Sequence, residues 1–169
     1  MSDILIAYQT LENLTVTLTD TVSSPVTPSV WGLDAIKQTV ETASLPVRIL
    51  YPLSPLSDLA TENKFIAIGK TATVTWQILD LLLWAPALSG LGVHSYADNL
   101  VEYIGAYAEA MRDIRDLAPV ASGGRSQMTL IDVRYLVDHI TWPLIEGSEN
   151  VRRYAGVAVL LTARESLTS

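Results

Sequence analysis

The chain has 169 residues, of which 49% are hydrophobic and only 17% are charged, so it is long and apolar enough for one domain with a sizeable core. The formal net charge of −7 argues against a protein that reads nucleic acid, because an acidic surface repels phosphates. The absence of cysteine excludes disulfide scaffolds, thiolate metal sites and cysteine nucleophiles. The longest apolar run, residues 78–93, contains Asp80 and Pro86 and is too short to span a bilayer, so we expect no membrane partner.

The N-terminal quarter begins with a helical pattern and then changes character. Apolar residues at three- and four-residue steps predict a helix over residues 3–13. Residues 14–19 alternate leucine and valine with threonine, which fits either a strand or a frayed continuation of that helix. Residues 20–44 are rich in Pro, Ser and Thr at their start and are predicted as an extended arm, within which 33–43 could form a short helix.

The next segments are predicted to be mainly extended. Pro46 and Pro52 bound a compact strand over residues 47–51. The polar residues 52–64 are expected to form a loop insertion. Residues 65–84 then predict one long extended run, which a turn rich in Pro and Gly follows.

The clearest pattern in the chain is an amphipathic helix over Ser95–Leu117, which Ser95 and Asp98 would cap in the manner of a capping box. Tyr96, Tyr103 and Tyr107 lie on its apolar stripe, and we expect them to pack there with their hydroxyls reaching the rim.

Two strands complete the predicted fold, over residues 131–138 and 151–163. In the first, odd-numbered apolar residues alternate with largely polar even-numbered ones, which predicts one buried and one polar face. The order of elements predicts an α+β fold: a four-stranded, mostly antiparallel sheet with one main amphipathic helix packed across it, plus a short N-terminal helix and an extended arm. Residues 1–169 are expected to form a single domain, with 20–44 and 52–64 as insertions.

The tripeptide Gly69-Lys70-Thr71 matches the end of a phosphate-binding loop. Such a loop needs a glycine five residues before the Gly-Lys pair and a helix directly after it. Lys64 occupies the upstream position, and the alternating β-branched run after Thr71 is typical of a strand. We therefore expect a long strand, with Gly69 at a bend and Lys70 as a charge at an interface.

No catalytic residue, metal site or cofactor is predicted. His94 and His139 have no neighbours at metal-ligand spacing, and we interpret them as ordinary surface or edge residues. A small enzyme remains an alternative, and it would need a cleft in which one of these histidines meets two acids. The tryptophans are expected in the core or at an interface; they are Trp31, Trp76, Trp84 and Trp142.

One group of charged residues is a candidate contact surface. Asp132, Arg134 and Asp138 share a face of the strand over 131–138, and Arg152 and Arg153 follow on the next strand. We expect this face to meet a neighbouring subunit or a partner protein, although charged strand faces are often merely solvated. The predicted interface residues are Lys70, Asp132, Arg134, Asp138, Arg152 and Arg153.

The sequence LPVRILYP at Leu45–Pro52, the helix over Ser95–Leu117 and the order of the elements resemble small neck and tail proteins of tailed bacteriophages. The closest resemblance is to the tail terminator group, of the minor tail protein U type. It implies a homo-oligomeric ring without catalytic residues, hexameric in that group, which caps the tail tube and joins it to the head connector.

The resemblance also implies the partners and the location. Other copies of the chain, the tail tube protein and the head connector or neck proteins would be its partners, and DNA would only pass through the ring. The protein would reside in the virion after assembly in the host cytoplasm. Because residues 20–38 and 54–64 exceed the smaller members of the group, another neck or head-completion protein remains an alternative. A non-viral homo-oligomeric adaptor without catalytic activity is a further one.

Overall fold

A computed structural model of the chain describes residues 3–51, 64–68, 71–87, 92–119, 122–124, 127–143 and 152–168. The fold is α+β, as predicted, and contains two α-helices and a six-stranded sheet. The helices are α1 (Ile4–Glu12) and α2 (Ala97–Met111), and the short 3₁₀ turns are η1 (Thr42–Ser44) and η2 (Val93–Tyr96). The strands are β1 (Ser29–Trp31), β2 (Val47–Tyr51), β3 (Lys64–Ile68), β4 (Thr71–Pro86), β5 (Gln127–Trp142) and β6 (Arg152–Thr168).

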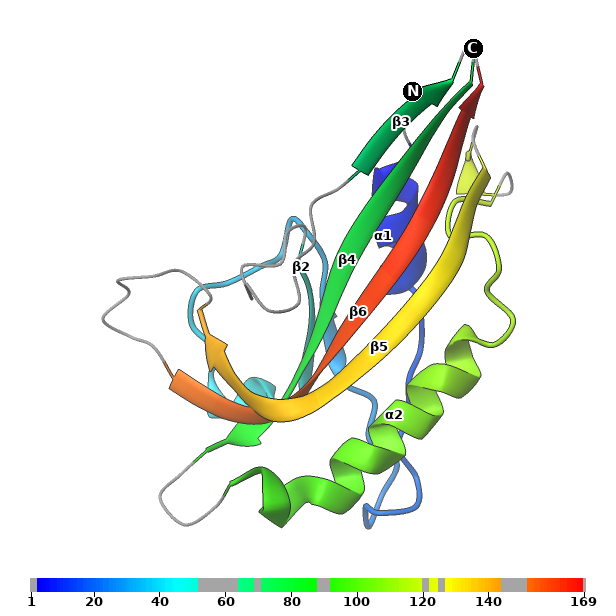
Figure 1. Cartoon of the computed structure of the whole chain (residues 1–169). Helices are drawn as coiled ribbons and strands as arrows, with labels where there is room; N and C mark the ends of the chain where they lie inside the picture. Colours follow the sequence, from blue (N-terminus) through cyan, green and yellow to red (C-terminus); the bar gives the residue numbers. More distant parts are fainter. Residues whose placement is uncertain are drawn as a thin grey trace.

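The sheet has the order β1-β2-β4-β6-β5, and β3 pairs with the start of β4 (Figure 1). Only β1 and β2 are parallel; every other pair is antiparallel. The long strands β4, β5 and β6 have 16, 16 and 17 residues and form the curved body of the sheet (Figure 1). The predicted count of four strands is therefore wrong, because β1 and the division of one run into β3 and β4 were missed.

The single extended run predicted over residues 65–84 is in fact two strands. β3 and β4 are antiparallel neighbours, with Ile68 opposite Thr71. That a strand and not a helix follows Gly69-Lys70-Thr71 is confirmed by β4. The predictions for Gly69 and Lys70 themselves, and for the loop over residues 52–63, lie outside the described residues.

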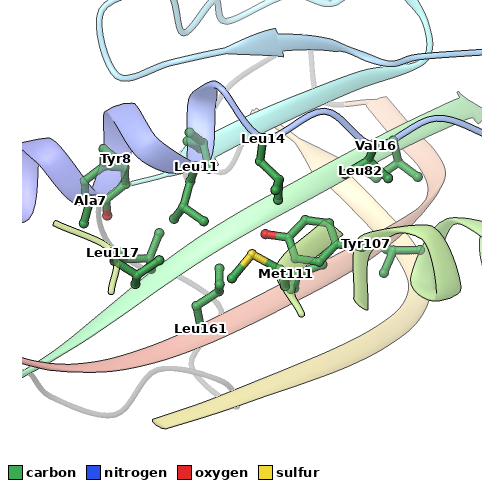
Figure 2. Packing of buried hydrophobic residues seen from close by; sticks show 14 of the residues in the cluster. Ala7, Tyr8, Leu11, Leu14, Val16, Leu82, Tyr107, Met111, Leu117 and Leu161 are labelled. Carbon is green, nitrogen blue, oxygen red and sulfur yellow. The ribbon is translucent and has the colours of Figure 1, made fainter. Parts of the chain in front are cut away.

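The centre of the sheet is covered on both faces. Even-numbered residues of β4, such as Ile78 and Leu82, pack with α1 and α2 in a first core cluster (Figure 2). Odd-numbered residues of β4, such as Leu79 and Leu81, pack on the other face with β1, β2 and the end of β5. A strand that is buried on both faces needs apolar residues at nearly every position, which explains the continuous apolar run in β4.

Both helices form, although the bounds of α2 differ from the prediction. α1 matches the predicted helix over residues 3–13 within one residue at each end. α2 begins at Ala97 without a side-chain cap, because Ser95 lies in η2, and it ends at Met111. Leu117 is fully buried beyond the helix, where its backbone N–H donates to the carbonyl of Met128 on β5. The apolar stripe thus continues after the helix has ended.

Residues 14–19 form neither a helix nor a regular strand. Leu14, Val16 and Leu18 are buried in the first cluster, as their alternation predicts for an extended segment. Their only ladder contact in the described chain is a single antiparallel bridge between Leu18 and Val26. The pattern therefore reports an extended segment that packs on the core without joining the sheet.

The arm predicted over residues 20–44 packs against the body of the protein. β1 adds a strand to the sheet edge, and Trp31 and Val40 are buried in the second cluster. The short helix predicted over 33–43 is wrong, because only the three-residue turn η1 forms, at Thr42–Ser44. None of the described helices is long and apolar enough to cross a membrane.

The last two strands form as a hairpin pair and are longer than predicted. β5 covers the predicted strand over 131–138, and β6 covers almost all of the one over 151–163. Val133, Tyr135 and Val137 pack against the first cluster, so the predicted division of β5 into two faces is confirmed there. Ile131 is the exception, since the register shifts between Leu130 and Asp132 and its side chain is 48% exposed.

Candidate functional site

The predicted contact surface is partly assembled on β5. Arg134 Nε donates to Asp132 Oδ2 over 2.7 Å, and the two side chains are 73% and 41% exposed. Both lie on the face of β5 opposite the helices, because the odd-numbered residues between them pack on the first cluster. This part of the charged face is therefore open, and the ion pair on it lies largely in solvent.

The remaining predicted residues are placed differently. Asp138 follows Arg134 on the same strand, but its carboxylate accepts the backbone N–H of His139 over 2.6 Å. Arg152 and Arg153 stand opposite Trp142 and Thr141, at the far end of the β5–β6 pair from Asp132. They line a hollow of about 340 Å³, whose other lining residues are Thr42, Pro86, Ala87 and Tyr154. The structure thus joins Asp132 to Arg134 and places the two neighbouring arginines at a separate location.

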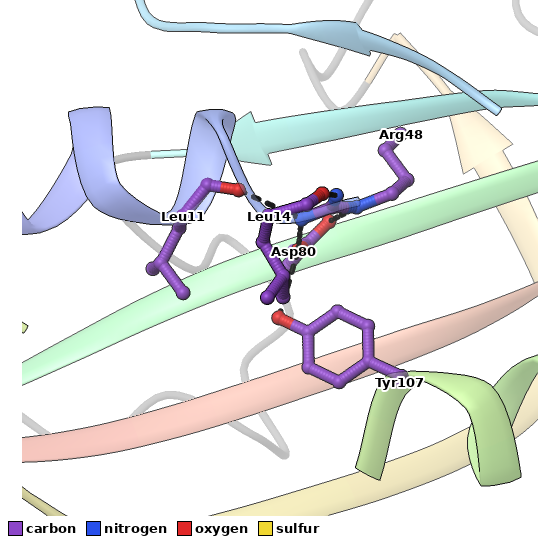
Figure 3. A network of polar contacts seen from close by, with 5 residues as sticks. All are labelled: Leu11, Leu14, Arg48, Asp80 and Tyr107. Carbon is purple, nitrogen blue, oxygen red and sulfur yellow. Dashed lines mark hydrogen bonds and ion pairs between the residues drawn. The ribbon is translucent and has the colours of Figure 1, made fainter. Parts of the chain in front are cut away.

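A second set of polar residues lies inside the protein, between β2, β4 and α2 (Figure 3). Arg48 and Asp80 are 1% and 0% exposed, and Arg48 Nη2 lies 2.6 Å from Asp80 Oδ2. The hydroxyl of Tyr107 donates to the same carboxylate oxygen over 2.9 Å. The guanidinium also donates to the carbonyls of Leu14 (2.6 Å) and Leu11 (3.1 Å). Each of the two buried charges is therefore neutralised and hydrogen-bonded, which such burial requires.

The surroundings raise the pKa values of Arg48 and of the two tyrosines Tyr103 and Tyr107. Burial alone lowers the pKa of the Arg48 guanidinium, but the adjacent Asp80 carboxylate outweighs it and raises that pKa. Burial raises the pKa of the Tyr103 and Tyr107 phenols well above their ordinary value, and the charge of Asp80 adds to this. The hydroxyl of Tyr103 is buried and has no hydrogen-bond partner among the described residues. The expectation that these tyrosine hydroxyls reach the rim is therefore wrong.

Two further carboxylates hold backbone segments. Glu165 on β6 is fully buried and accepts hydrogen bonds from the backbone N–H of Asp3 and from Trp76 Nε1, both at 2.7 Å. These contacts fix the start of α1 against the end of β6.

The four tryptophans are buried or packed against the two core clusters, so the prediction that they lie in the core is confirmed.

The carboxylate of Glu102 on α2 is surrounded by donors from the arm. The backbone N–H groups of Thr19, Asp20 and Thr21 donate to it over 2.5 to 2.8 Å, and the Thr21 hydroxyl donates as well. Desolvation raises the pKa of Glu102, but the hydrogen bonds from Asp20, Thr21 and Thr19 outweigh it and lower the pKa to about 2. The arm is thus tied to α2 by an ionised carboxylate.

The histidines offer little to an enzyme within the described residues. His139 Nδ1 lies 3.9 Å from Asp138 Oδ1, and this is the one ion pair that either histidine makes there. His94 is exposed in η2. No group of three or more metal-ligating side chains occurs in that part of the chain. The cleft that the enzyme alternative needs, in which a histidine meets two acids, is not found among these residues.

Sequence reasoning missed the roles of Arg48, Asp80, Glu102 and Glu165. A signal was present for the first two, because each is the only charged residue in its strand and has apolar neighbours on both sides. Such isolated charges are costly to bury alone and predict a partner of opposite sign. Glu165 gave no such signal, since Arg164 and Ser166 flank it, and Glu102 resembles an ordinary surface charge of an amphipathic helix.

No protein-family model, no curated protein and no solved structure matches the chain.

Proposed function

We propose that the chain is a structural subunit of a tailed phage particle, which forms a tail terminator-like ring that caps the tail tube and joins it to the head connector. The observation that carries the proposal is the open charged face of β5, with the Asp132–Arg134 pair at its centre. A surface that holds both signs of charge suits a contact with a partner of complementary pattern. The resemblance in element order supplies the identity of that partner.

The use of the other charges supports a structural role. Arg48, Asp80 and Glu165 form hydrogen bonds in the core, where they fix the two ends of α1 and the packing of α2. Glu102 ties the arm to α2. These four charged side chains thus contribute to holding the fold.

The acidic charge of the subunit suits a passage for DNA. Six subunits of net charge −7 carry about −42 in total, since 6 × 7 = 42. A lumen of this sign would repel the phosphate backbone and let DNA slide. A basic lumen in the assembled ring would contradict this part of the proposal.

The test is a capping assay with tail tubes assembled from a purified tail tube protein. The wild-type chain should form rings at tube ends, seen by electron microscopy. Arg134→Glu should keep the far-ultraviolet circular dichroism spectrum but lose capping, because it removes the cation from the charged face. Arg112→Glu is the matched control, since Arg112 is an exposed arginine that follows α2, away from the sheet face.

Two outcomes would count against the proposal. If Arg134→Glu caps tubes as well as the wild type does, the charged face of β5 is merely solvated. If the wild-type chain forms a stable homo-oligomer that ignores tail tubes, the non-viral adaptor alternative is favoured instead.

A further inference from the structure

One edge of β5 has no strand partner among the described residues for most of its length. β5 is the outermost strand of the sheet on its side, next to β6. Its first residues are covered by the segment after α2, through hydrogen bonds from Leu117 to Met128 (2.9 Å) and from Leu130 to Arg115 (3.4 Å). From Ile131 to Trp142, no strand among the described residues pairs with this edge. Unpaired N–H and C=O groups along a strand are a template for another strand.

The side chains along this edge include both apolar and charged residues. Two of the four exposed large apolar side chains in the described chain lie on β5, namely Ile131 (48%) and Leu136 (43%). Edge strands are commonly protected by charged residues, proline or bulges, and charges of a single sign also repel a second copy of the same strand. β5 instead carries charges of both signs, placed symmetrically: Arg134 lies two positions before Leu136, and Asp138 lies two positions after it.

This symmetry makes the edge complementary to itself. Two copies of β5 can pair antiparallel about a two-fold axis that is normal to the sheet. This axis passes midway between the two copies of Leu136. Leu136 then faces Leu136 of the second copy, and Arg134 of each copy faces Asp138 of the other. Residues directly opposite in such a pair have Cβ atoms about 4.5–5.5 Å apart, within reach of an ion pair. One apolar contact, between the two Leu136 side chains, would be flanked on each side by an ion pair between Arg134 and Asp138.

Other registers fit less well. A two-fold axis normal to the sheet keeps every side chain on its own face of the sheet. The axis must therefore lie level with one residue of β5, which then faces its own copy, and not level with the midpoint between two successive residues. An axis through Tyr135 places Asp132 opposite Asp138, which are like charges. An axis through Val133 places Asp138 opposite Met128, in the stretch that the segment after α2 already covers.

We propose that the open edge of β5 is a homodimer interface, in which two copies pair through β5 about an axis at Leu136. The occupant of the edge is a second copy of this chain. Arg134 can serve both partners, because its contact to Asp132 uses Nε and the guanidinium carries two further donor nitrogens. The interface does not depend on the phage assignment. It is closed by two subunits, whereas a ring requires head-to-tail contacts, so it would add to a ring.

The chain contains no cysteine, so disulfide trapping has no background. Leu136→Cys places one thiol at the axis, and mild oxidation with diamide should convert most of the protein to a covalent dimer on a non-reducing gel. Arg134→Cys and Asp138→Cys alone should not link, because each residue lies four positions, about 13 Å, from its own copy across the axis. The double variant Arg134→Cys/Asp138→Cys should link again, because the thiol at position 134 of one copy then faces the thiol at position 138 of the other.

The uncrosslinked protein should show the same contact. Light scattering of the wild-type chain should give twice the subunit mass of 18.4 kDa. Leu136→Lys should give the single mass, because it sets two ammonium groups opposite each other at the axis. Glu109→Gln is the control that should stay dimeric, since Glu109 is an exposed residue of α2 and does not lie on β5.

Three outcomes would overturn the inference: a monomeric wild type with no link at position 136, equal linking of all single-cysteine variants, or an oligomer whose cysteines link only in another register. The result is separable from the test of the proposed function. Tube capping without a link at Leu136 refutes the β5 dimer alone, and a link at Leu136 without capping refutes the terminator role alone.

Discussion

Arg48 and Glu165 place buried charges of opposite sign at the two ends of α1. Arg48 donates to the carbonyls of Leu11 and Leu14 at and just beyond the C-terminal end, and Glu165 accepts the backbone N–H of Asp3 at the other. The dipole of a helix is positive at its N-terminus and negative at its C-terminus, so both charges complement it. A helix of nine residues is not stable alone, and these two contacts help to fix α1 on the sheet.

Removal of Arg48 should be among the most destabilising single changes in the core. Arg48→Met leaves Asp80 as an unpaired buried charge and deprives two backbone carbonyls of their donor, which should cost about 3–5 kcal/mol. Urea unfolding of the variant measures this loss. Arg48→Met/Asp80→Leu should be more stable than Arg48→Met alone, because no charge is then left unpaired. The single variant Asp80→Leu completes the comparison. If the losses of Arg48→Met and Asp80→Leu simply add in the double variant, Arg48 and Asp80 are not energetically coupled.

Two tyrosines of α2 should respond in opposite ways to the loss of their hydroxyls. Tyr107→Phe removes a hydrogen bond to the buried carboxylate of Asp80 and should cost about 1.5–3 kcal/mol. Tyr103→Phe should be neutral or stabilising, because its hydroxyl is buried and has no hydrogen-bond partner among the described residues. Both rings stay in the same cluster, so each variant controls for the packing of the other. Equal losses in thermal unfolding would contradict this assignment.

The sequence was most informative where a periodic pattern coincided with burial. α1 and the two faces of β5 follow from apolar spacing alone, because the side of each element that meets the core must be apolar. The end of α2 was overestimated for the same reason. Leu117 continues the helical spacing but is buried through pairing with β5, and periodicity does not distinguish these two causes of burial.

Contacts between distant segments were not predictable in the same way. Glu102 looks like a solvated charge on a helix, and the three amides that it binds lie more than 80 residues earlier in the chain. The hairpin of β3 and β4 did leave a signal. Two residues separate the paired Ile68 and Thr71, and one of them is glycine, which is typical of a two-residue connection. The unbroken β-branched pattern on both sides concealed it.

The tie between Glu102 and the arm should weaken in acid. The pKa of Glu102 is lowered from 4.5 to about 2, so its contribution to stability is fully present above pH 4.5 and is lost as the pH falls through 2. Glu102→Gln should remove this contribution at neutral pH. Hydrogen exchange at the Thr19, Asp20 and Thr21 amides should then accelerate, while the core strands stay protected.

The control for this experiment is Glu109→Gln, which changes another exposed carboxylate of α2 that makes none of these contacts. Exchange at the three arm amides should be unchanged in that variant. If Glu102→Gln leaves their exchange unchanged as well, the carboxylate does not hold the arm in solution.

Gly156 tests how closely β4 and β6 pack, and Gly105 in α2 serves as its comparison. At Gly156 an added Cβ would lie 2.1 Å from the backbone carbonyl oxygen of Leu82, which cannot move without disturbing the centre of the sheet. Gly156→Ala should therefore cost about 1–3 kcal/mol of the free energy of unfolding. Gly105→Ala should instead stabilise by about 0.5–1 kcal/mol, because Gly105 lies within α2 and no atom lies within 4 Å of its added Cβ. Denaturant unfolding of both variants gives the two signs directly, and a neutral Gly156→Ala would show that β4 and β6 can separate locally at little cost.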